Sequence, residues 1–164
     1  MPAARALAAL ALLLFAGIAW YLAPLEPSVL ALQFQFTPKS YGYVIHAWTE
    51  DDLQRYRAHF AADYLLLTAY GAMGWMVATR SAGFRALPGA IRRSARWWLP
   101  VAAVFDAVEN ALQLWLTAVP RFGVPLPYAV SAGCSVAKWS LLFAFGLLAL
   151  WALARTNDPC KARP

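Results

Sequence analysis

The stretch FDAVENALQLW, residues 105–115, places two acids and two amides inside a strongly apolar part of the chain. On an α-helix, where each residue turns by 100°, its polar side chains fall within a band of about 100°. This band consists of Asp106, Glu109, Asn110, Gln113 and Thr117. A helix that is otherwise apolar turns such a stripe inward, so the segment predicts an all-α bundle with a polar interior.

The composition of the whole chain is typical of an integral membrane protein. Of the 164 residues, 62% are hydrophobic and 13% are charged, which lies outside the range of water-soluble domains. A helix needs roughly 20 apolar residues to cross the hydrocarbon of a bilayer. Four stretches qualify: about 5–24, 60–80, 97–118 and 127–153. We therefore expect one polytopic domain over residues 1–164, a bundle of four transmembrane helices.

The first apolar stretch has two interpretations. Arg5 precedes an apolar core, as in a cleaved signal peptide. No small-x-small cleavage site follows the core, however, and Trp20 and Tyr21 lie where an interfacial aromatic belt is expected. We expect a retained helix, with no visible chemistry of its own.

Positive charge gathers in the connection between the second and third helices. Residues 80–96 contain no acid and five arginines: Arg80, Arg85, Arg92, Arg93 and Arg96. Further cations follow the fourth helix at Arg155, Lys161 and Arg163. The positive-inside rule then predicts a cytoplasmic basic loop and cytoplasmic N- and C-termini, in a bacterial inner membrane. We expect anionic lipid headgroups, and no nucleic acid, as partners of the net charge of +6.

The outer segment, residues 25–59, is expected to carry short helices between the first two membrane helices. Residues 33–36 alternate Gln and Phe, which suggests an extended or interfacial piece. Thr37 followed by Pro38 predicts a helix start, and Tyr41, Ile45 and Trp48 then share one side, as in an amphipathic helix on a membrane surface. A second start at Thr49, with three acids in the first turn, predicts a helix that runs without interruption to about Thr79.

The other helices carry polar faces that match the first one. Tyr56, His59, Asp63 and Tyr70 share a face of the second helix, and Ser131, Cys134, Ser135 and Lys138 share a face of the fourth. At the depth of Asp106 and Glu109, Lys138 is able to neutralise one of them. Buried carboxyl groups so close together cannot all ionise, so we expect one to hold a proton near neutral pH and to serve as a general acid or base, or as a proton carrier.

These patterns give a candidate site, with a structural role as the alternative. Asp106, Glu109 and Asp63 are the candidate catalytic residues; the candidates for binding or orienting a substrate are Asn110, Lys138, Gln113, Tyr70, His59, Trp115 and Trp139. The alternative is that amide bonds and one ion pair only fix the helix register. The cysteines and histidines have no spacing typical of metal ligands, so we expect neither a metal nor a cofactor.

The layout resembles the EXPERA domain, the four-helix family of emopamil-binding and sigma-2-receptor-like proteins. The residues that carry the resemblance are Tyr41 to Trp48, the long helix from Thr49, Asp63, and Asp106 with Glu109. It covers most of the chain in architecture only, and implies cytoplasmic termini and acids around a sterol-sized cavity. The segment Asp106, Glu109, Asn110, followed by Lys138 and Trp139, is also similar to small bacterial membrane proteins of no assigned activity.

Three functions follow as hypotheses. The first is an enzyme that isomerises or cyclises a lipid or isoprenoid by proton transfer, with a carbocation stabilised by carboxylates and aromatic faces. The second is a small proton-coupled transporter, although no inverted repeat is visible. The third is a non-catalytic subunit or lipid-binding protein that docks through residues 33–59. The expected partners are membrane lipids and an apolar small molecule, and the sequence does not indicate an oligomeric state.

Overall fold

The computed structural model describes residues 2–118, 121 and 123–156, and confirms the all-α fold. Its elements are α1 (Pro2–Leu22), α2 (Val29–Gln33), α3 (Pro38–Ala47), α4 (Glu50–Ala58), α5 (Phe60–Arg80), α6 (Ala82–Arg85), α7 (Gly89–Ala118) and α8 (Leu126–Thr156). No strand occurs among the described residues. Lys161 and Arg163, two of the cations used in the topology prediction, lie outside these ranges.

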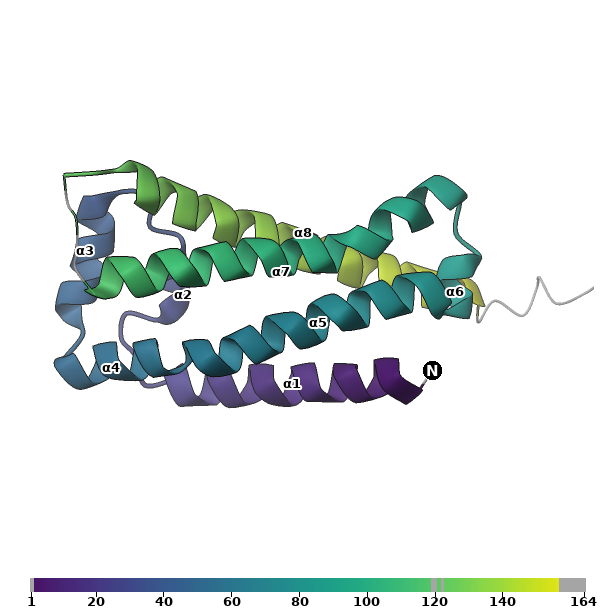
Figure 1. Ribbon diagram of the computed structural model, residues 1–164, viewed down its shortest axis with the longest axis horizontal. Coiled ribbons are helices and arrows are strands. Elements are labelled where there is room, and N and C mark those ends of the chain that lie inside the picture. Colours follow the sequence, from purple (N-terminus) through teal and green to yellow (C-terminus); the bar gives the residue numbers. More distant parts are fainter. Residues whose placement is uncertain (1, 119–120, 122, 157–164) are drawn as a thin grey trace, which may run out of the picture.

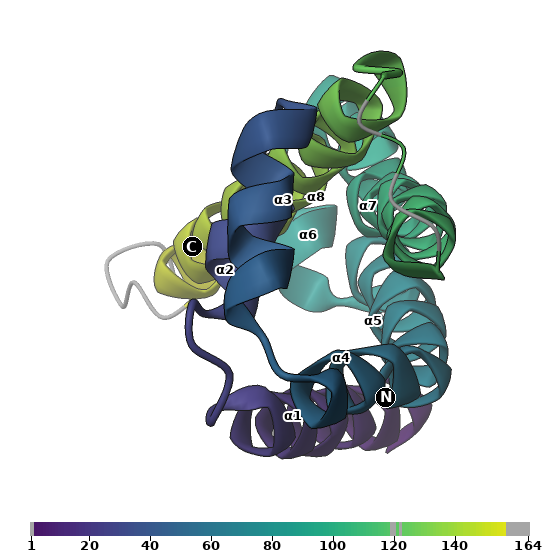
Figure 2. The same ribbon diagram turned by 90° about the vertical axis from the view of Figure 1, so that its left-hand side faces the viewer.

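The four long helices lie side by side in an arc (Figure 1). Helix α1 packs on α5, α5 packs on α7, and α7 packs on α8. Viewed from the end that carries α3, α1 and α8 stand at the two ends of the arc (Figure 2). The short helices α2, α3 and α4 cover this end, and α6 joins α5 and α8 at the opposite end.

Both predicted helix starts in the outer segment are present. The Thr37 hydroxyl accepts a hydrogen bond of 3.2 Å from the Ser40 amide, with Pro38 as the first residue of α3. Thr49 and Asp52 form a complete capping box on α4. The hydrogen bonds that the Asp52 carboxylate accepts from Thr49 hold the pKa of this acid below its ordinary value.

The expected uninterrupted helix from Thr49 to Thr79 is wrong, because α4 ends at Ala58 and α5 begins at Phe60. His59 lies at the break, and its Nδ1 atom contacts the carbonyl of Tyr56. In a continuous helix this carbonyl would bond to the amide of residue 60. The imidazole therefore competes with the helix for the same acceptor.

Two other expected segments also differ. Gln33 ends the short helix α2, which the Ser28 side chain caps, so the expected extended piece does not include it. The basic residues 80–96 are largely helical: they form α6 and the first turns of α7, which begins at Gly89 and not near residue 97. Helix α7 thus continues past the apolar stretch as far as Gly89, although Pro100 lies inside it.

Small residues bring α5 and α7 together. A Cβ atom added at Gly74 would lie 2.4 Å from the Cβ atom of Leu99, and one at Gly71 would lie 3.2 Å from that of Ala103. Glycine is therefore required at residue 74 for the present separation of the two helices. This close contact helps to set the positions of the polar residues, which precede it on α5 and follow it on α7.

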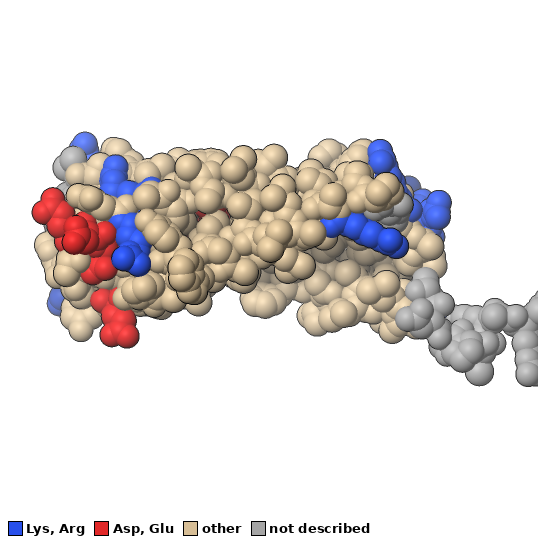
Figure 3. All heavy atoms as spheres, turned by 90° about the horizontal axis from the view of Figure 1, so that it is seen from below, with Lys and Arg blue, Asp and Glu red and all other residues tan. Residues whose placement is uncertain are grey.

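Within the described part of the chain, two helices are long and apolar enough to cross a membrane: α1 and, within α8, Leu126–Arg155. The same criterion does not select α5 or α7, so it supports two of the four expected spans. On the face seen in Figure 3, Lys, Arg, Asp and Glu gather at the two ends of the bundle, and uncharged side chains cover the length between them except for a small recessed area of Asp or Glu atoms.

Candidate functional site

A buried ion-pair triad joins α7 and α8. The Lys138 ammonium lies 2.6 Å from Asp106 Oδ1 and 2.7 Å from Glu109 Oε2, and all three side chains are buried. The sequence left open whether Lys138 pairs with Asp106 or with Glu109, and the structure shows that it contacts both. One ammonium thus faces two carboxyl groups.

Asp106 receives a second donor from α5. The Tyr70 hydroxyl donates a hydrogen bond of 3.0 Å to Asp106 Oδ2, so the two oxygens of this carboxylate are bonded to a phenol and an ammonium. Hydrogen bonds to ionised groups are stronger than neutral ones. Asp106 is thus held by one donor on each of its two oxygens.

Asp63 has a different environment. Asn110 Nδ2 donates a hydrogen bond of 2.5 Å to Asp63 Oδ2. Among the described residues, no cation lies within ion-pair distance of this carboxyl group. Asp63 therefore has a neutral amide as its partner, whereas Asp106 has an ammonium.

Glu109 is the most deeply placed acid. Its side chain is 2% exposed, and Oε2 is buried without an accepted hydrogen bond, although it lies close to the ammonium. The contact between Lys138 and Glu109 Oε2 is thus an ion pair, because its angles do not satisfy the geometry of a hydrogen bond. We refer below to Asp63, Asp106, Glu109 and Lys138 as the carboxylate cluster.

A second buried network lies nearer the end that carries α3. The Tyr41 hydroxyl donates to Gln113 Oε1 at 2.6 Å, and Gln113 Nε2 donates to the Ser131 hydroxyl at 3.0 Å. Burial raises the pKa of Tyr41, so the phenol stays a neutral donor. This network links α3 to α7 and α8 with each of its amide atoms bonded, which is typical of a structural role.

A cavity of about 710 Å³ opens beside the carboxylate cluster, in the size range of single-ligand pockets. Its polar lining comes from Asp63, Asp106, Lys138, Tyr70, His59, Gln33, Ser28 and Trp139. The rest of the lining is apolar and comes from α1, α2, α5 and α8, and includes Leu12, Phe15, Leu66 and Phe143. The cavity thus joins a polar wall to a long apolar surface.

The cavity separates the predicted site residues into three groups. Asp63, Asp106, Lys138, Tyr70, His59 and Trp139 line it as expected. Glu109, Asn110 and Gln113 are buried and bonded to neighbouring side chains or paired with Lys138, but they do not line it. Trp115 lies elsewhere, exposed on the outer surface of α7 with the Arg121 guanidinium 4.9 Å from its ring. Trp48 is buried against Tyr56, and it too does not line the cavity.

The prediction omitted Gln33 and Tyr41, although both contribute. Gln33 accepts a hydrogen bond of 3.2 Å from the Trp139 indole, which connects α2 to the cavity wall of α8. Only the folding of the outer segment back onto α8 makes this contact, so no local pattern indicates it. Tyr41 was recognised as part of an amphipathic face, but its bond to Gln113 spans 72 positions.

His59 lines the cavity close to the break between α4 and α5. Its side chain is buried, and this burial lowers the pKa of the imidazole. With Nδ1 against the Tyr56 carbonyl, a neutral ring carries its proton on Nδ1 and leaves Nε2 as an acceptor. His59 therefore provides an acceptor near Asp63.

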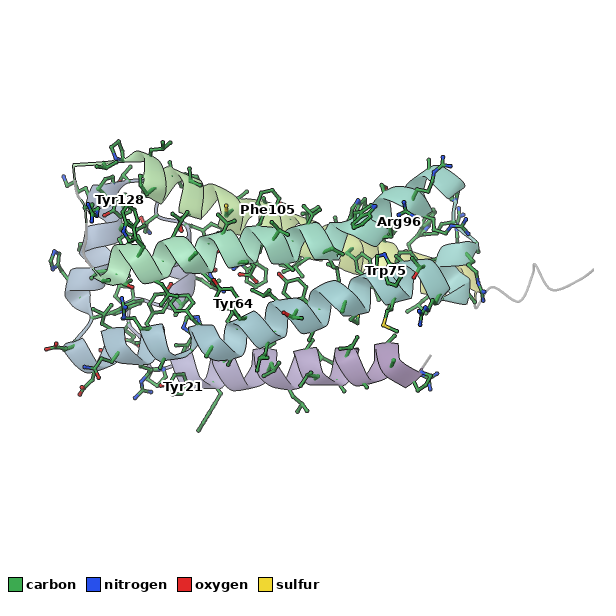
Figure 4. The ribbon with its side chains drawn as sticks, in the orientation of Figure 1. Tyr21, Tyr64, Trp75, Arg96, Phe105 and Tyr128 are labelled. Atoms are coloured by element: carbon green, nitrogen blue, oxygen red, sulfur yellow. The ribbon has the colours of Figure 1, made fainter. Side chains whose placement is uncertain are left out.

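Figure 4 shows the side chains between α5 and α7, where Tyr64 lies. The Tyr64 hydroxyl donates to the Ala107 carbonyl at 3.3 Å and adds a third bond between these helices. In the described part of the chain, no group of three or more His, Cys, Asp or Glu side chains is arranged to hold a metal ion. No protein-family model matches the chain, and comparisons with curated proteins and with solved structures give no match.

Proposed function

We propose that all four long helices of this protein span a membrane. The support is the placement of charge: within residues 6–22, 60–79, 97–118 and 126–154, the charged residues are the four members of the carboxylate cluster. Three of them are buried and the fourth, Asp63, is half-buried. The outward surface of α5 and α7 is apolar, for example at Leu65 and Val104. The polar residues of α5 and α7 point inward, so they lower the mean hydropathy of these helices without contacting lipid.

The basic end of the bundle faces the cytoplasm in this proposal. Arg5, Arg80, Arg85, Arg92, Arg93, Arg96 and Arg155 belong to this end, which has no acid among the described residues. The acids of α4 belong to the opposite end. The positive-inside rule favours this orientation, with both termini cytoplasmic, in a bacterial inner membrane.

The proposed activity is acid–base catalysis on a membrane lipid or isoprenoid, as an isomerase or cyclase. The single observation that carries it is the apolar cavity that ends on two carboxyl groups with different partners, Asp63 and Asp106. Pairs of acids in unequal environments are able to act as donor and acceptor of protons in one reaction. The EXPERA resemblance in architecture is consistent with this proposal.

The contacts assign the two roles. Asp63, which bonds to a neutral amide, donates a proton to one carbon of a substrate double bond and becomes a carboxylate. The π electrons form the new C–H bond and leave a carbocation at the other carbon. Asp106 removes a proton from a carbon next to the cation, and the C–H electrons form the shifted double bond. In a cyclisation, a second double bond attacks the cation before this last proton leaves.

Other residues hold the reacting groups in place. Lys138 and Tyr70 each donate a hydrogen bond to the carboxylate of Asp106. Asn110 donates one to Asp63. Glu109 forms an ion pair with Lys138 and so holds the ammonium in place. The Trp139 ring lines the cavity, where its π face is able to stabilise the carbocation. Water is kept from the cation by the apolar walls on α1 and α8.

Deuterium incorporation tests this activity without a known substrate. Membranes that contain the protein are incubated in D₂O, and the extracted lipids are analysed by mass spectrometry. We expect at least one apolar lipid to gain deuterium with the wild type and not with Asp63→Asn or Asp106→Asn. The matched control is Asp51→Asn, an exposed acid on α4. If no lipid gains deuterium in a way that depends on Asp63 and Asp106, the protein is a lipid-binding protein and not this enzyme.

A further inference from the structure

The rim of the cavity is formed by exposed apolar side chains. Leu12 is 69% exposed, Phe143 is 66% exposed, and both line the cavity together with the exposed Phe15 and Leu30. An opening toward water would expose this rim at a large cost in free energy, whereas an opening toward lipid tails would not. The mouth of the cavity therefore suits the hydrocarbon of a bilayer.

The mouth lies between the first and last long helices. α1 packs on α5 and α8 packs on α7, but α1 and α8 do not form a packed pair. Both nevertheless line the same cavity, and they stand at the ends of the arc in Figure 2. A molecule is thus able to enter sideways between them without separating any packed pair of long helices.

The lining changes along the axis of the bundle. Its residues on α1 run from Ala8 to Leu22, which at 1.5 Å per residue is about 21 Å. Toward the end that carries α3, it includes His59 and Gln33. Toward the basic end, the lining of α1 and α5 is apolar as far as Ala8 and Met73. A ligand with one polar end and a long apolar chain matches this gradient.

The charge of the cavity wall determines which polar group a ligand is able to place there. The carboxylate cluster contains three carboxyl groups and one ammonium, which pairs with two of them, so an anionic group such as a phosphate would meet like charge. The wall offers donors at Lys138 and acceptors at Asp63 and His59. A hydroxyl group, which donates and accepts at once, satisfies both kinds of partner.

We propose that this cavity takes an uncharged, chain-bearing alcohol from the bilayer through the opening between α1 and α8, and rejects its phosphorylated form. The hydroxyl group lies against the carboxylate cluster, and the chain runs along α1 toward the basic end. The proposal names the ligand class and route for the site described above and rests on the proposed membrane embedding. It does not require that the site performs catalysis.

Equilibrium binding of two probes with the same hydrocarbon chain tests this proposal. Geranylgeraniol and geranylgeranyl phosphate are added to the purified full chain in nanodiscs, and native mass spectrometry counts the bound molecules. We expect the alcohol to bind one to one and the phosphate to bind at least about a hundredfold more weakly, since like charges in a site cost several kcal/mol. Equal binding of the two probes would overturn the proposal.

Two adjacent leucines on α1 test the route. Leu12 lines the cavity, whereas Leu13 is 73% exposed and is absent from its lining. Leu12→Trp narrows the mouth and should slow the association of the alcohol severalfold, as measured from the time course of binding, whereas Leu13→Trp should match the wild type. Equal effects of the two variants would exclude entry between α1 and α8. Selective alcohol binding without deuterium incorporation would refute the proposed catalysis alone, and deuterium incorporation with no preference for the alcohol would refute this inference alone.

Discussion

Tyr41 of α3 and Gln113 of α7 are joined by a buried hydrogen bond of 2.6 Å across 72 positions of the chain. We expect Tyr41→Phe to lower the free energy of unfolding by about 1–3 kcal/mol, because the buried Gln113 Oε1 loses its hydrogen-bond donor. Unfolding by a denaturing detergent measures this loss. Tyr43→Phe, on the exposed side of the same helix, is the matched control and should change the free energy little.

Lys138 is the cation on which two buried acids depend. Lys138→Met should destabilise the protein by about 3–5 kcal/mol, because it leaves Asp106 and Glu109 buried without a counter-charge. The double variant Lys138→Met with Glu109→Gln should recover part of this loss in the same unfolding measurement. A loss in the single variant smaller than about 1 kcal/mol would mean that the triad is not desolvated as described.

The acids of the carboxylate cluster should differ in their effect on turnover. Asp63→Asn and Asp106→Asn should abolish lipid deuteration, because both side chains line the cavity. Glu109→Gln should retain part of it, because Glu109 contacts Lys138 and not the cavity. Deuterium uptake per molecule of folded protein, measured against Asp51→Asn, provides the comparison. Complete loss in Glu109→Gln alone would restore the sequence-based assignment of this residue as acid or base.

His59 should make stability depend on pH. Burial lowers the pKa of its imidazole in the folded state below the value of 6.5 for an unperturbed group, so between these two values the unfolded chain binds more protons. The folded state then loses stability as the pH falls through 6.5. Unfolding measured from pH 8 to pH 5 should show this decline in the wild type and a smaller one in His59→Gln. If the free energy of unfolding declined equally with pH in the wild type and in His59→Gln, the burial of His59 would not be the cause of the decline.

The contact between α5 and α7 should depend on Gly74. Gly74→Ala places a methyl group 2.4 Å from the Leu99 Cβ atom, and overpacking of this kind costs about 1–3 kcal/mol. Gly17→Ala on α1 meets nothing within 4 Å, so it should be neutral or stabilise the helix slightly. Thermal unfolding in detergent distinguishes the two, and equal midpoints would exclude close packing at Gly74.

The sequence predicted the parts of the fold that depend on local patterns. The 100° periodicity of α7 placed Asp106, Glu109 and Asn110 on one buried face, and Thr37 and Thr49 marked helix starts because their side chains bond within one turn. The break at His59 escaped prediction, because a competition between an imidazole and a backbone amide for one carbonyl leaves no trace in periodicity.

The site was predicted less completely than the fold. Complementary charge on neighbouring helices indicated that Lys138 meets the acids. The packing of α1 against α5, however, determines which of the predicted residues line the cavity and which are buried behind its wall. Trp115 was predicted as a candidate substrate-binding residue, but its side chain is exposed on the outer surface of α7. Gln33 reaches the cavity only because the outer segment folds back onto α8.

The position of Lys138 in the last helix also orders the events of biosynthesis. Translation proceeds from the N-terminus, so Asp63, Asp106 and Glu109 are all made before Lys138, the cation that pairs with Asp106 and Glu109. In the proposed membrane embedding, a chain that stops before α8 would carry three inward acids and no counter-ion, and would insert less stably. Asp106 and Glu109 therefore gain their cation only after α8 has been synthesised.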